Sequence, residues 1–229
     1  MTMASCTVVI PAHNEEDTIG GLVECALVHA DRVIVANDSS TDRTEQVAEE
    51  AGAIVALVPR ERRGLVGVYS FGLRVAVALH RTAPCGGRGA YVCEMDAGGS
   101  HDPHELPKFW KALDEGADIA AGCRFAYGGE YLGSWQRKSL SYFGTKLTNI
   151  VHGTKWCDAT SGFVAYRSSS LDALLQVPYK STGHYYQTEM RLRAQAMGMK
   201  TTEVPITYRN SGSSLNWRSI REALSLVMR

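Results

Sequence analysis

The sequence predicts a single α/β domain built on a mostly parallel central sheet flanked by helices. Three observations carry this prediction: short β-branched runs alternate with helical patterns, the loops between them are short, and polar residues follow the predicted strands. Strands and helices that alternate in this way form parallel sheets with right-handed crossovers. The 229 residues are enough for one large domain with a sizeable core.

The composition argues against several classes of protein. The formal net charge is +0, so no global field favours nucleic acid as a partner. The six cysteines are scattered without a C-x-x-C pair, which is typical of reduced thiols in the cytoplasm. The N-terminus lacks a secretory pattern, and the apolar stretch 65–79 is too short to span a bilayer. We therefore expect a cytoplasmic protein that is soluble or lies on a surface.

The first third of the chain reads as three strands and two helices. We expect strands at 6–10, 32–36 and 53–58, and helices at 19–27 and 44–51. Asn14 is the predicted N-cap of the first helix, and a polar cluster at 37–44 leads from the second strand into the second helix.

Three arginines, Arg60, Arg62 and Arg63, precede Gly64 and a helical pattern that runs to about residue 80. They are either a solvated loop or, near the carboxyl edge of the sheet, contacts for a phosphate. A glycine-rich turn at 84–89 follows.

The central stretch of the chain is 91–103, where an apolar strand ends in Asp96, then glycines, then His101, Asp102 and Pro103. A carboxylate that follows a buried strand beside glycines is placed where open α/β sheets bind ligands. The alternative is a plain turn in which Asp102 and Pro103 cap the next helix. That helix is expected at 104–115, before a strand at 118–122.

The second half of the chain has a different composition. The aromatic and glycine-rich segment 125–135 is typical of a mobile loop over a site. The helix expected at 136–151 opens with Arg137 and Lys138; it either packs on the core or meets anionic lipid headgroups. A strand at 163–166, a helix at 184–197, a strand at 202–208 and an amphipathic helix at 217–228 complete the prediction.

Several ordered motifs carry a resemblance to a known family. The segments 8–16 (VVIPAHNEE), 37–42 (NDSSTD) and 95–98 (MDAG) resemble signatures of inverting family 2 glycosyltransferases, which have the Rossmann-like GT-A fold. The segments 121–125, 160–167, 183–190 and 203–206 are similar to the polyprenyl-phosphate (dolichyl-phosphate) mannosyltransferase branch. The resemblance implies a nucleotide-sugar-binding half, about 1–123, and an acceptor-binding half, about 124–229, within one domain of residues 1–229.

The resemblance also implies roles for particular residues. Asp38 would accept a hydrogen bond from the nucleobase, Asp96 would bind a divalent metal, Mg or Mn, and Arg124 would contact the diphosphate or the acceptor phosphate. The implied nucleotide-sugar site comprises Pro11, His13, Glu15, Asn37, Asp38, Arg63, Ala97, Gly98 and Arg209, and the implied catalytic residues are Asp96, Arg124, Gln187 and Glu189.

Three positions depart from the family pattern. The usual Asp-x-Asp ends in Gly98, so metal binding would rest on Asp96 with help from nearby side chains, or be replaced by the arginines. A lysine usual near 212–214 is missing, which leaves Arg209 or Arg218 as substitutes. The arginine that often follows the Gly-Phe pair is Val164. The candidate helpers of Asp96 are Ser100, His101 and Asp102.

Gln187 separates two classes of acceptor. A hydroxyl acceptor needs a general base, and the family usually places an aspartate in the segment that contains Gln187. A phosphate monoester is already anionic and needs no base. Gln187 therefore favours a phosphate acceptor, although Glu189 keeps the hydroxyl reading open.

We expect a hexose transferase, with GDP-mannose as the leading donor and a polyprenyl phosphate as the acceptor. The enzyme would work on the cytosolic membrane face, brought there by the helices at 136–151 and 216–229 or by a membrane-anchoring partner protein. One alternative is a soluble transferase that moves a UDP- or GDP-sugar to a hydroxyl of a protein, nucleic acid or small molecule. The other, motivated by Gly98, is a pseudo-enzyme that binds nucleotide-sugar without turnover.

Overall fold

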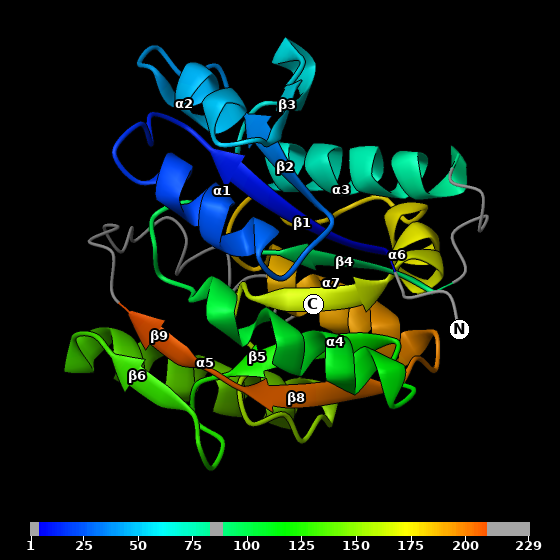
Figure 1. Cartoon of the computed structure of the whole chain (residues 1–229). Coiled ribbons are helices and arrows are strands. Elements are labelled where there is room, and N and C mark those ends of the chain that lie inside the picture. Colours follow the sequence, from blue (N-terminus) through cyan, green and yellow to red (C-terminus); the bar gives the residue numbers. More distant parts are fainter. Residues whose placement is uncertain (1–4, 83–88, 210–229) are drawn as a thin grey trace.

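The computed structural model describes residues 5–82 and 89–209, and its centre is a seven-stranded sheet (Figure 1). The strand order is β3-β2-β1-β4-β7-β5-β8. The strands are β1 (Ser5–Ala12), β2 (Arg32–Asn37), β3 (Ile54–Leu57), β4 (Ala90–Glu94), β5 (Ile119–Cys123), β7 (Val164–Arg167) and β8 (Thr201–Pro205). The predicted mostly parallel sheet of a single α/β domain is confirmed.

One strand of the sheet runs against the others. β7 pairs antiparallel with β4 on one side and with β5 on the other, whereas the remaining pairs of this sheet are parallel. The chain reaches β7 only after a long excursion through β6 (Glu130–Leu132) and α5 (Trp135–His152). The alternation of strands and helices does not predict this reversal.

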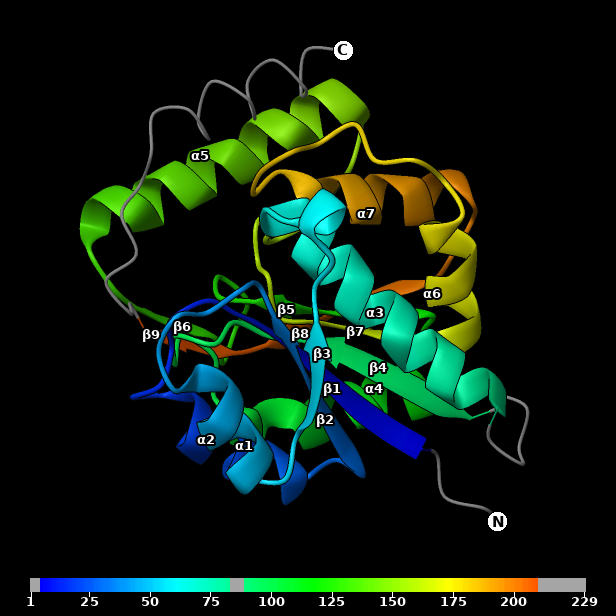
Figure 2. The same ribbon diagram turned by 90° about the horizontal axis from the view of Figure 1, so that it is seen from above.

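Helices cover both faces of the sheet (Figure 2). Contacts place α1, α2 and α4 on one face and α3, α6 and α7 on the other. The helices are α1 (Ile19–Leu27), α2 (Thr44–Glu50), α3 (Leu65–Thr82), α4 (Leu106–Asp114), α6 (Ser168–Leu175) and α7 (Tyr186–Ala196), with short 3-10 turns at η1 (Arg60–Arg62) and η2 (Pro103–Glu105). The sequence prediction contained no helix at α6.

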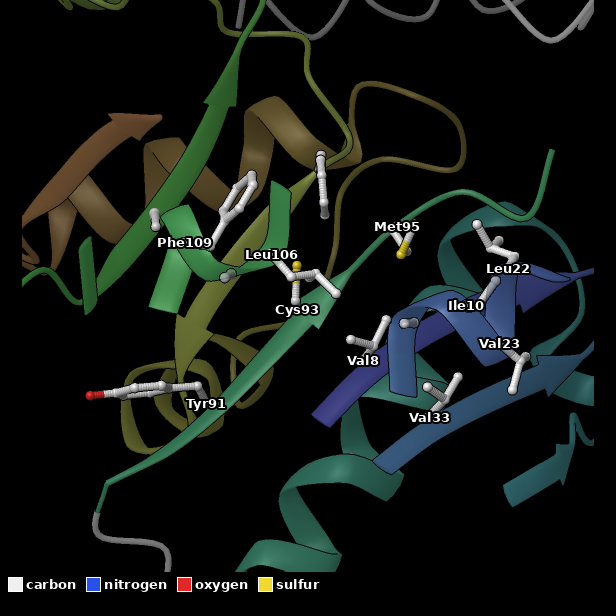
Figure 3. Close-up of a cluster of buried hydrophobic side chains, with 14 of the residues drawn as sticks. Val8, Ile10, Leu22, Val23, Val33, Tyr91, Cys93, Met95, Leu106 and Phe109 are labelled. Carbon is white, nitrogen blue, oxygen red and sulfur yellow. The ribbon is translucent and has the colours of Figure 1, made fainter. Parts of the chain in front are cut away.

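Each face of the sheet has its own hydrophobic core. On the first face, Val8 of β1, Cys93 of β4 and Met95, which follows β4, belong to one cluster with Leu22 of α1 and Phe109 of α4 (Figure 3). A second cluster fills the opposite face beneath α3, α6 and α7. Because successive strand residues point to opposite faces, strands buried on both sides need continuous apolar runs. The two cores fix the ends of the central strands, where the candidate site lies.

The prediction of a mobile loop at 125–135 is wrong in part. Residues Glu130–Leu132 form β6, which pairs in parallel with β9 (Thr207–Arg209) in a separate two-stranded sheet. Tyr131 is buried and its ring lies 5.1 Å from that of Tyr208. The single strand predicted at 202–208 is split in the same way, since β8 ends at Pro205 and β9 belongs to the smaller sheet.

Helix α5 lies outside the layered body, beyond α7 (Figure 2), and buries little of its surface. Among its residues only Thr145 and Thr148 are buried. No helix in the described part of the chain is long and apolar enough to cross a membrane. The helix predicted at 217–228, Arg218 and nearly all of the turn at 84–89 lie outside the described residues.

Candidate active site at the carboxyl ends of β1, β2 and β4

The candidate site lies where the strand order reverses. β1 is flanked by β2 and β4, and the next elements leave these strands in opposite directions along the sheet. Ala12 pairs with Asn37, and Val9 pairs with Glu94. The segments that follow the three strands therefore meet at one edge, which is the topological switch point where open α/β sheets bind ligands. This edge brings together His13, Asp38 and Asp96.

Asp38 has an unpaired acceptor. Its Oδ1 is buried without a hydrogen-bond partner among the described residues, while Oδ2 lies 3.4 Å from the backbone N of Gly64. The exposed His13 has its Nδ1 2.8 Å from the backbone O of Asp38, so this nitrogen carries a proton and donates it. A buried acceptor without a partner is costly in a folded protein. Asp38 can accept the ring N–H of a ligand.

The other residues predicted beside Asp38 mostly shape the loops. Asn37 is buried: its Oδ1 accepts from Ser40 N at 3.0 Å, and its Nδ2 donates to Glu45. Pro11 is half-buried near the end of β1, and the half-buried Glu15 accepts from the Thr18 hydroxyl at 3.1 Å. The amide of Asn37 is therefore committed to the turn that presents Asp38.

The prediction that Asn14 caps the first helix is wrong. Asn14 has φ 55° and α1 begins later, at Ile19, with Thr18 in the N-cap position. Asn14 Oδ1 instead accepts from the backbone N of Thr41 at 2.8 Å. Asparagine tolerates the left-handed region, so it can turn the chain and join the loops that follow β1 and β2.

The arginine loop (Arg60–Gly64) lies beside Asp38. The side chains of Arg60, Arg62 and Arg63 are exposed, and none forms an ion pair with the residues that the structure describes. Gly67 packs directly on the backbone of Arg62, because a Cβ on this glycine would lie 2.0 Å from the Arg62 carbonyl oxygen. The loop is thus held in place while its three guanidinium groups remain available to an anion.

Asp96 follows β4 and keeps one carboxylate oxygen available. Its Oδ1 accepts from the Tyr69 hydroxyl at 2.5 Å, and its side chain is 38% exposed. The Asp96 backbone N donates to Nδ1 of the buried His101 at 3.2 Å. Burial lowers the pKa of His101, which is therefore neutral near pH 7. Asp96 thus offers one oxygen at the exposed edge of the sheet.

The candidate helpers of Asp96 add little to a metal site. Asp102 accepts from His104 N at 3.0 Å and from Arg209 at 3.1 Å, which also ties down the predicted Arg209. Ala97 is buried and Gly98 half-buried, and neither has a side-chain donor. In the described parts of the chain, no group of three or more His, Cys, Asp or Glu residues could hold a metal ion. A cation bound here would rely on Asp96 and on ligand oxygens.

A second carboxylate lies behind Asp96 and was not singled out from the sequence. Glu94 is fully buried, with its two oxygens accepting from the hydroxyls of Tyr166 and Tyr186, each at 2.8 Å. Burial raises the pKa of Glu94 to about 8, although the two tyrosine hydrogen bonds act in the opposite direction. The sequence feature that could have identified Glu94 is an acidic residue inside an otherwise apolar strand.

Arg124 makes a bidentate contact with Asp158. Nε lies 2.6 Å from Oδ2 and Nη2 lies 2.8 Å from Oδ1, and Nη2 also donates to Thr160. Arg124 is 7% exposed, and three aromatic rings surround its guanidinium. Burial would raise the pKa of Asp158, but the bonds from Arg124 outweigh it and lower that pKa.

The side chains of Gln187 and Asp96 both lie close to Gly162. A Cβ on Gly162 would lie 3.2 Å from Gln187 Nε2 and 3.6 Å from Asp96 Oδ1. Gln187 is buried at the start of α7, so its position is defined by packing. The structure thus places the amide of Gln187 beside Asp96 at this point.

Glu189 is bound internally. Its carboxylate accepts from the backbone N of Lys180 at 2.9 Å and of Ser181 at 2.8 Å, and it pairs with Arg193. Burial would raise the pKa of Glu189, but the hydrogen bonds from Ser181 and its neighbours outweigh it and lower that pKa. A carboxylate held in this way fastens the loop before α7.

Comparisons with known proteins identify the family to which the chain belongs. Residues 7–175 match the model of Glycosyl transferase family 2. The chain is 31% identical to a polyprenol monophosphomannose synthase of Mycolicibacterium smegmatis, over 96% of this chain and 84% of that protein. It is 32% identical to an undecaprenyl-phosphate mannosyltransferase of Micrococcus luteus, over 87% of this chain and 82% of the relative.

A solved structure shares the fold. It is the glucosyl-3-phosphoglycerate synthase of Mycobacterium tuberculosis in complex with Mn²⁺, UDP and glucosyl-3-phosphoglycerate, with a TM-score of 0.70 and 19% identity over 98% of this chain and 77% of that one. Another structure of that synthase holds Mg²⁺ and UDP. The family model covers most of the chain, and the two relatives cover nearly all of it. The chain belongs to glycosyltransferase family 2 and is a glycosyltransferase with the GT-A fold.

Proposed function

We propose that this glycosyltransferase moves mannose from GDP-mannose to a polyprenyl phosphate with inversion at the anomeric carbon. The observation that carries the proposal is the amide of Gln187, which faces Asp96 across Gly162 where a base for a hydroxyl acceptor would be required. An acceptor phosphate is already ionised near neutral pH and attacks without losing a proton. The engagement of Glu189 with Ser181 and Arg193 argues in the same direction.

The donor site is proposed along the ends of β1 and β2. The unpaired Oδ1 of Asp38 supports a hydrogen bond from the N–H of a guanine or uracil ring. The exposed arginine loop beside it supplies positive charge for a diphosphate. The choice of mannose rests on the names of the two relatives, a polyprenol monophosphomannose synthase and an undecaprenyl-phosphate mannosyltransferase. The choice of guanine rests on the resemblance of the sequence motifs to the mannosyltransferase branch.

The residues at Asp96 fit a divalent cation that is completed by the substrate. Asp96 offers one oxygen at a partly exposed position, and hard cations prefer such ligands. A bound Mg²⁺ or Mn²⁺ would supply positive charge near the leaving diphosphate. Arginines of the loop Arg60–Gly64 add charge to the same leaving group, and the fixed geometry of the sheet edge orients donor and acceptor.

Helix α5 is the proposed contact with the membrane that holds the acceptor. Trp135, Phe143 and Ile150 are 73%, 67% and 79% exposed, and their spacing places them on one side of the helix. Lys138 and Lys146 are exposed on the same helix. An amphipathic helix with aromatic and basic residues binds at the surface of an anionic bilayer. We propose that the enzyme binds this membrane peripherally, on its cytosolic face.

The function is tested by offering several donors to one acceptor. Labelled GDP-mannose, GDP-glucose and UDP-glucose are incubated with polyprenyl phosphate in vesicles, and the label in the organic phase is counted. We expect label from GDP-mannose only, and its loss in Asp96→Ala. Label transferred from UDP-glucose would contradict GDP-mannose as the donor.

The role of Asp38 has its own test by calorimetric titration with GDP. Asp38→Asn removes the unpaired acceptor charge, so we expect GDP affinity to fall about 10- to 100-fold, the cost of a lost charged hydrogen bond. The stability of the free protein should stay the same or rise. Equal GDP affinity in both proteins would exclude Asp38 from the nucleobase site.

A further inference from the structure

We infer that Tyr69 is a positioning residue for Asp96: its hydroxyl holds one carboxylate oxygen so that the other faces the bound cation. The inference rests on the proposed function in one respect, since it assumes that a divalent cation binds at Asp96. It assigns a role to a residue of α3 that none of the family motifs discussed above contains.

The first argument is the hydrogen bond itself. The Tyr69 hydroxyl lies 2.5 Å from Asp96 Oδ1, at the short end for a bond between a hydroxyl and a carboxylate. Tyr69 is buried, and its hydroxyl is the donor of this bond while the Asp96 carboxylate accepts. The bond therefore ties one oxygen of Asp96 to α3.

The second argument is that Tyr69 cannot easily move. Its ring lies 5.5 Å from the ring of Tyr186, and the Tyr186 hydroxyl is bound to the buried Glu94. Tyr69 also belongs to the core cluster beneath α3. Because core packing and the ring of Tyr186 both hold Tyr69, its hydroxyl fixes the orientation of the Asp96 carboxylate.

The third argument concerns His101, another polar side chain near the carboxylate. Its Nδ1 accepts the backbone N–H of Asp96 at 3.2 Å, and a backbone N–H can only donate, so Nδ1 carries no proton. The distance of 3.9 Å from His101 Nδ1 to Asp96 Oδ2 is therefore no hydrogen bond. Within the described residues, Tyr69 supplies the one side-chain hydrogen bond to the Asp96 carboxylate.

The consequence is specific to this chain. Neither Ala97 nor Gly98 offers a carboxylate, so the single carboxylate of Asp96 has to meet the cation in a defined orientation. Hydrogen bonds from outer residues orient carboxylate ligands, and their loss typically lowers metal affinity about 10- to 100-fold. The Tyr69 hydroxyl would therefore fix the orientation of this single carboxylate.

The test measures the cation directly, without turnover. Free Mn²⁺ is followed by its paramagnetic resonance signal during titration of the protein saturated with GDP. Tyr69→Phe removes only the hydroxyl, and we expect it to weaken Mn²⁺ binding about 10- to 100-fold. The matched control is Tyr91→Phe, which removes a hydroxyl that donates to Asp114 at 2.7 Å from the same strand as Glu94. It should leave Mn²⁺ affinity within about twofold.

A double-mutant cycle with Asp96→Asn separates positioning from a general loss of structure. If Tyr69 acts through Asp96, Tyr69→Phe should have no further effect on Mn²⁺ affinity in the Asp96→Asn background. Equal effects in both backgrounds, or Mn²⁺ affinity unchanged in the single variant, would overturn the inference. Failure of the proposed function would appear elsewhere, as absent sugar transfer to polyprenyl phosphate by a wild-type protein that binds Mn²⁺ and GDP.

Discussion

Arg124 and Asp158 form a buried bidentate ion pair, with Nε 2.6 Å from Oδ2 and Nη2 2.8 Å from Oδ1. Asp158 is fully buried, and its neighbour Cys157 donates its backbone N–H to Glu203. The pair joins the end of β5 to the loop that leads to Gly162 and β7. This arrangement indicates that Arg124 holds one wall of the site in place.

Breaking this pair should be costly. Arg124→Met leaves a buried carboxylate unpaired, so we expect the free energy of unfolding in urea to fall by about 3–5 kcal/mol. The control is Arg81→Met, which breaks an ion pair with Asp172 in which the arginine side chain is 61% exposed. It should cost at most about 1 kcal/mol. If Arg124→Met keeps full stability but loses transfer, the arginine contacts substrate instead.

The same pair predicts a dependence on pH. Because the pKa of Asp158 is lowered in the folded protein, its contribution to stability is present above the unfolded pKa of about 4 and is lost as the pH falls further. In Arg124→Met, burial without a partner should raise that pKa, so acid should stabilise the variant. Urea unfolding from pH 7 to pH 3 should show that the difference in free energy of unfolding between wild type and Arg124→Met becomes smaller. A difference that stays constant over this pH range would contradict the proposed role of the ion pair.

Gly162 should be intolerant of a side chain for reasons of function. In Gly162→Ala the new methyl group would lie 3.2 Å from Gln187 Nε2 and 3.6 Å from Asp96 Oδ1. We expect kcat/KM for transfer to fall about 10- to 100-fold, since small displacements of reacting groups are costly. Gly21→Ala in α1, where nothing lies within 4 Å of the new Cβ, should gain about 0.5–1 kcal/mol in stability and keep its activity. Equal kcat/KM in both variants would exclude the space over Gly162 from the site.

The exposed face of α5 should carry membrane binding. Replacing Phe143 and Ile150 by serine removes apolar area that would enter the bilayer, at about 1.5–3 kcal/mol for each fully buried side chain. We expect co-sedimentation with vesicles of anionic lipid to fall at least tenfold. The control is Val28→Ser at the C-cap of α1, where the valine is 73% exposed. Vesicle binding that is lost equally in the control, or kept in the double variant, would contradict the role of α5.

The fold could be predicted because its parallel strands and crossover helices have distinct periodicities. The loop residues His13, Asp38 and Asp96 each follow one of these strands, and the carboxyl ends of parallel strands meet at one edge of the sheet. The direction of β7 could not be predicted, because an apolar strand of four residues reads the same whichever way it runs. The sequence shows neither its partner strands nor its orientation.

Pairings between distant residues account for most of what the sequence left open. Tyr69 lies within a helical apolar pattern and reads as a core residue, so its bond to Asp96 appears only in the fold. Arg124 looked available for a phosphate because nothing in the sequence identifies Asp158 as its partner. From the sequence alone Glu189 is a candidate base, because its hydrogen bonds from the backbone of Lys180 and Ser181 appear only in the fold.

The central claim is that the acceptor is a phosphate that needs no base. The most direct measurement compares polyprenyl phosphate with polyprenol of the same chain length as acceptors for labelled GDP-mannose. We predict transfer to the phosphate alone, with kcat little changed in Gln187→Asn. Transfer to polyprenol at a comparable rate would contradict the claim, because it would show that the site deprotonates a hydroxyl.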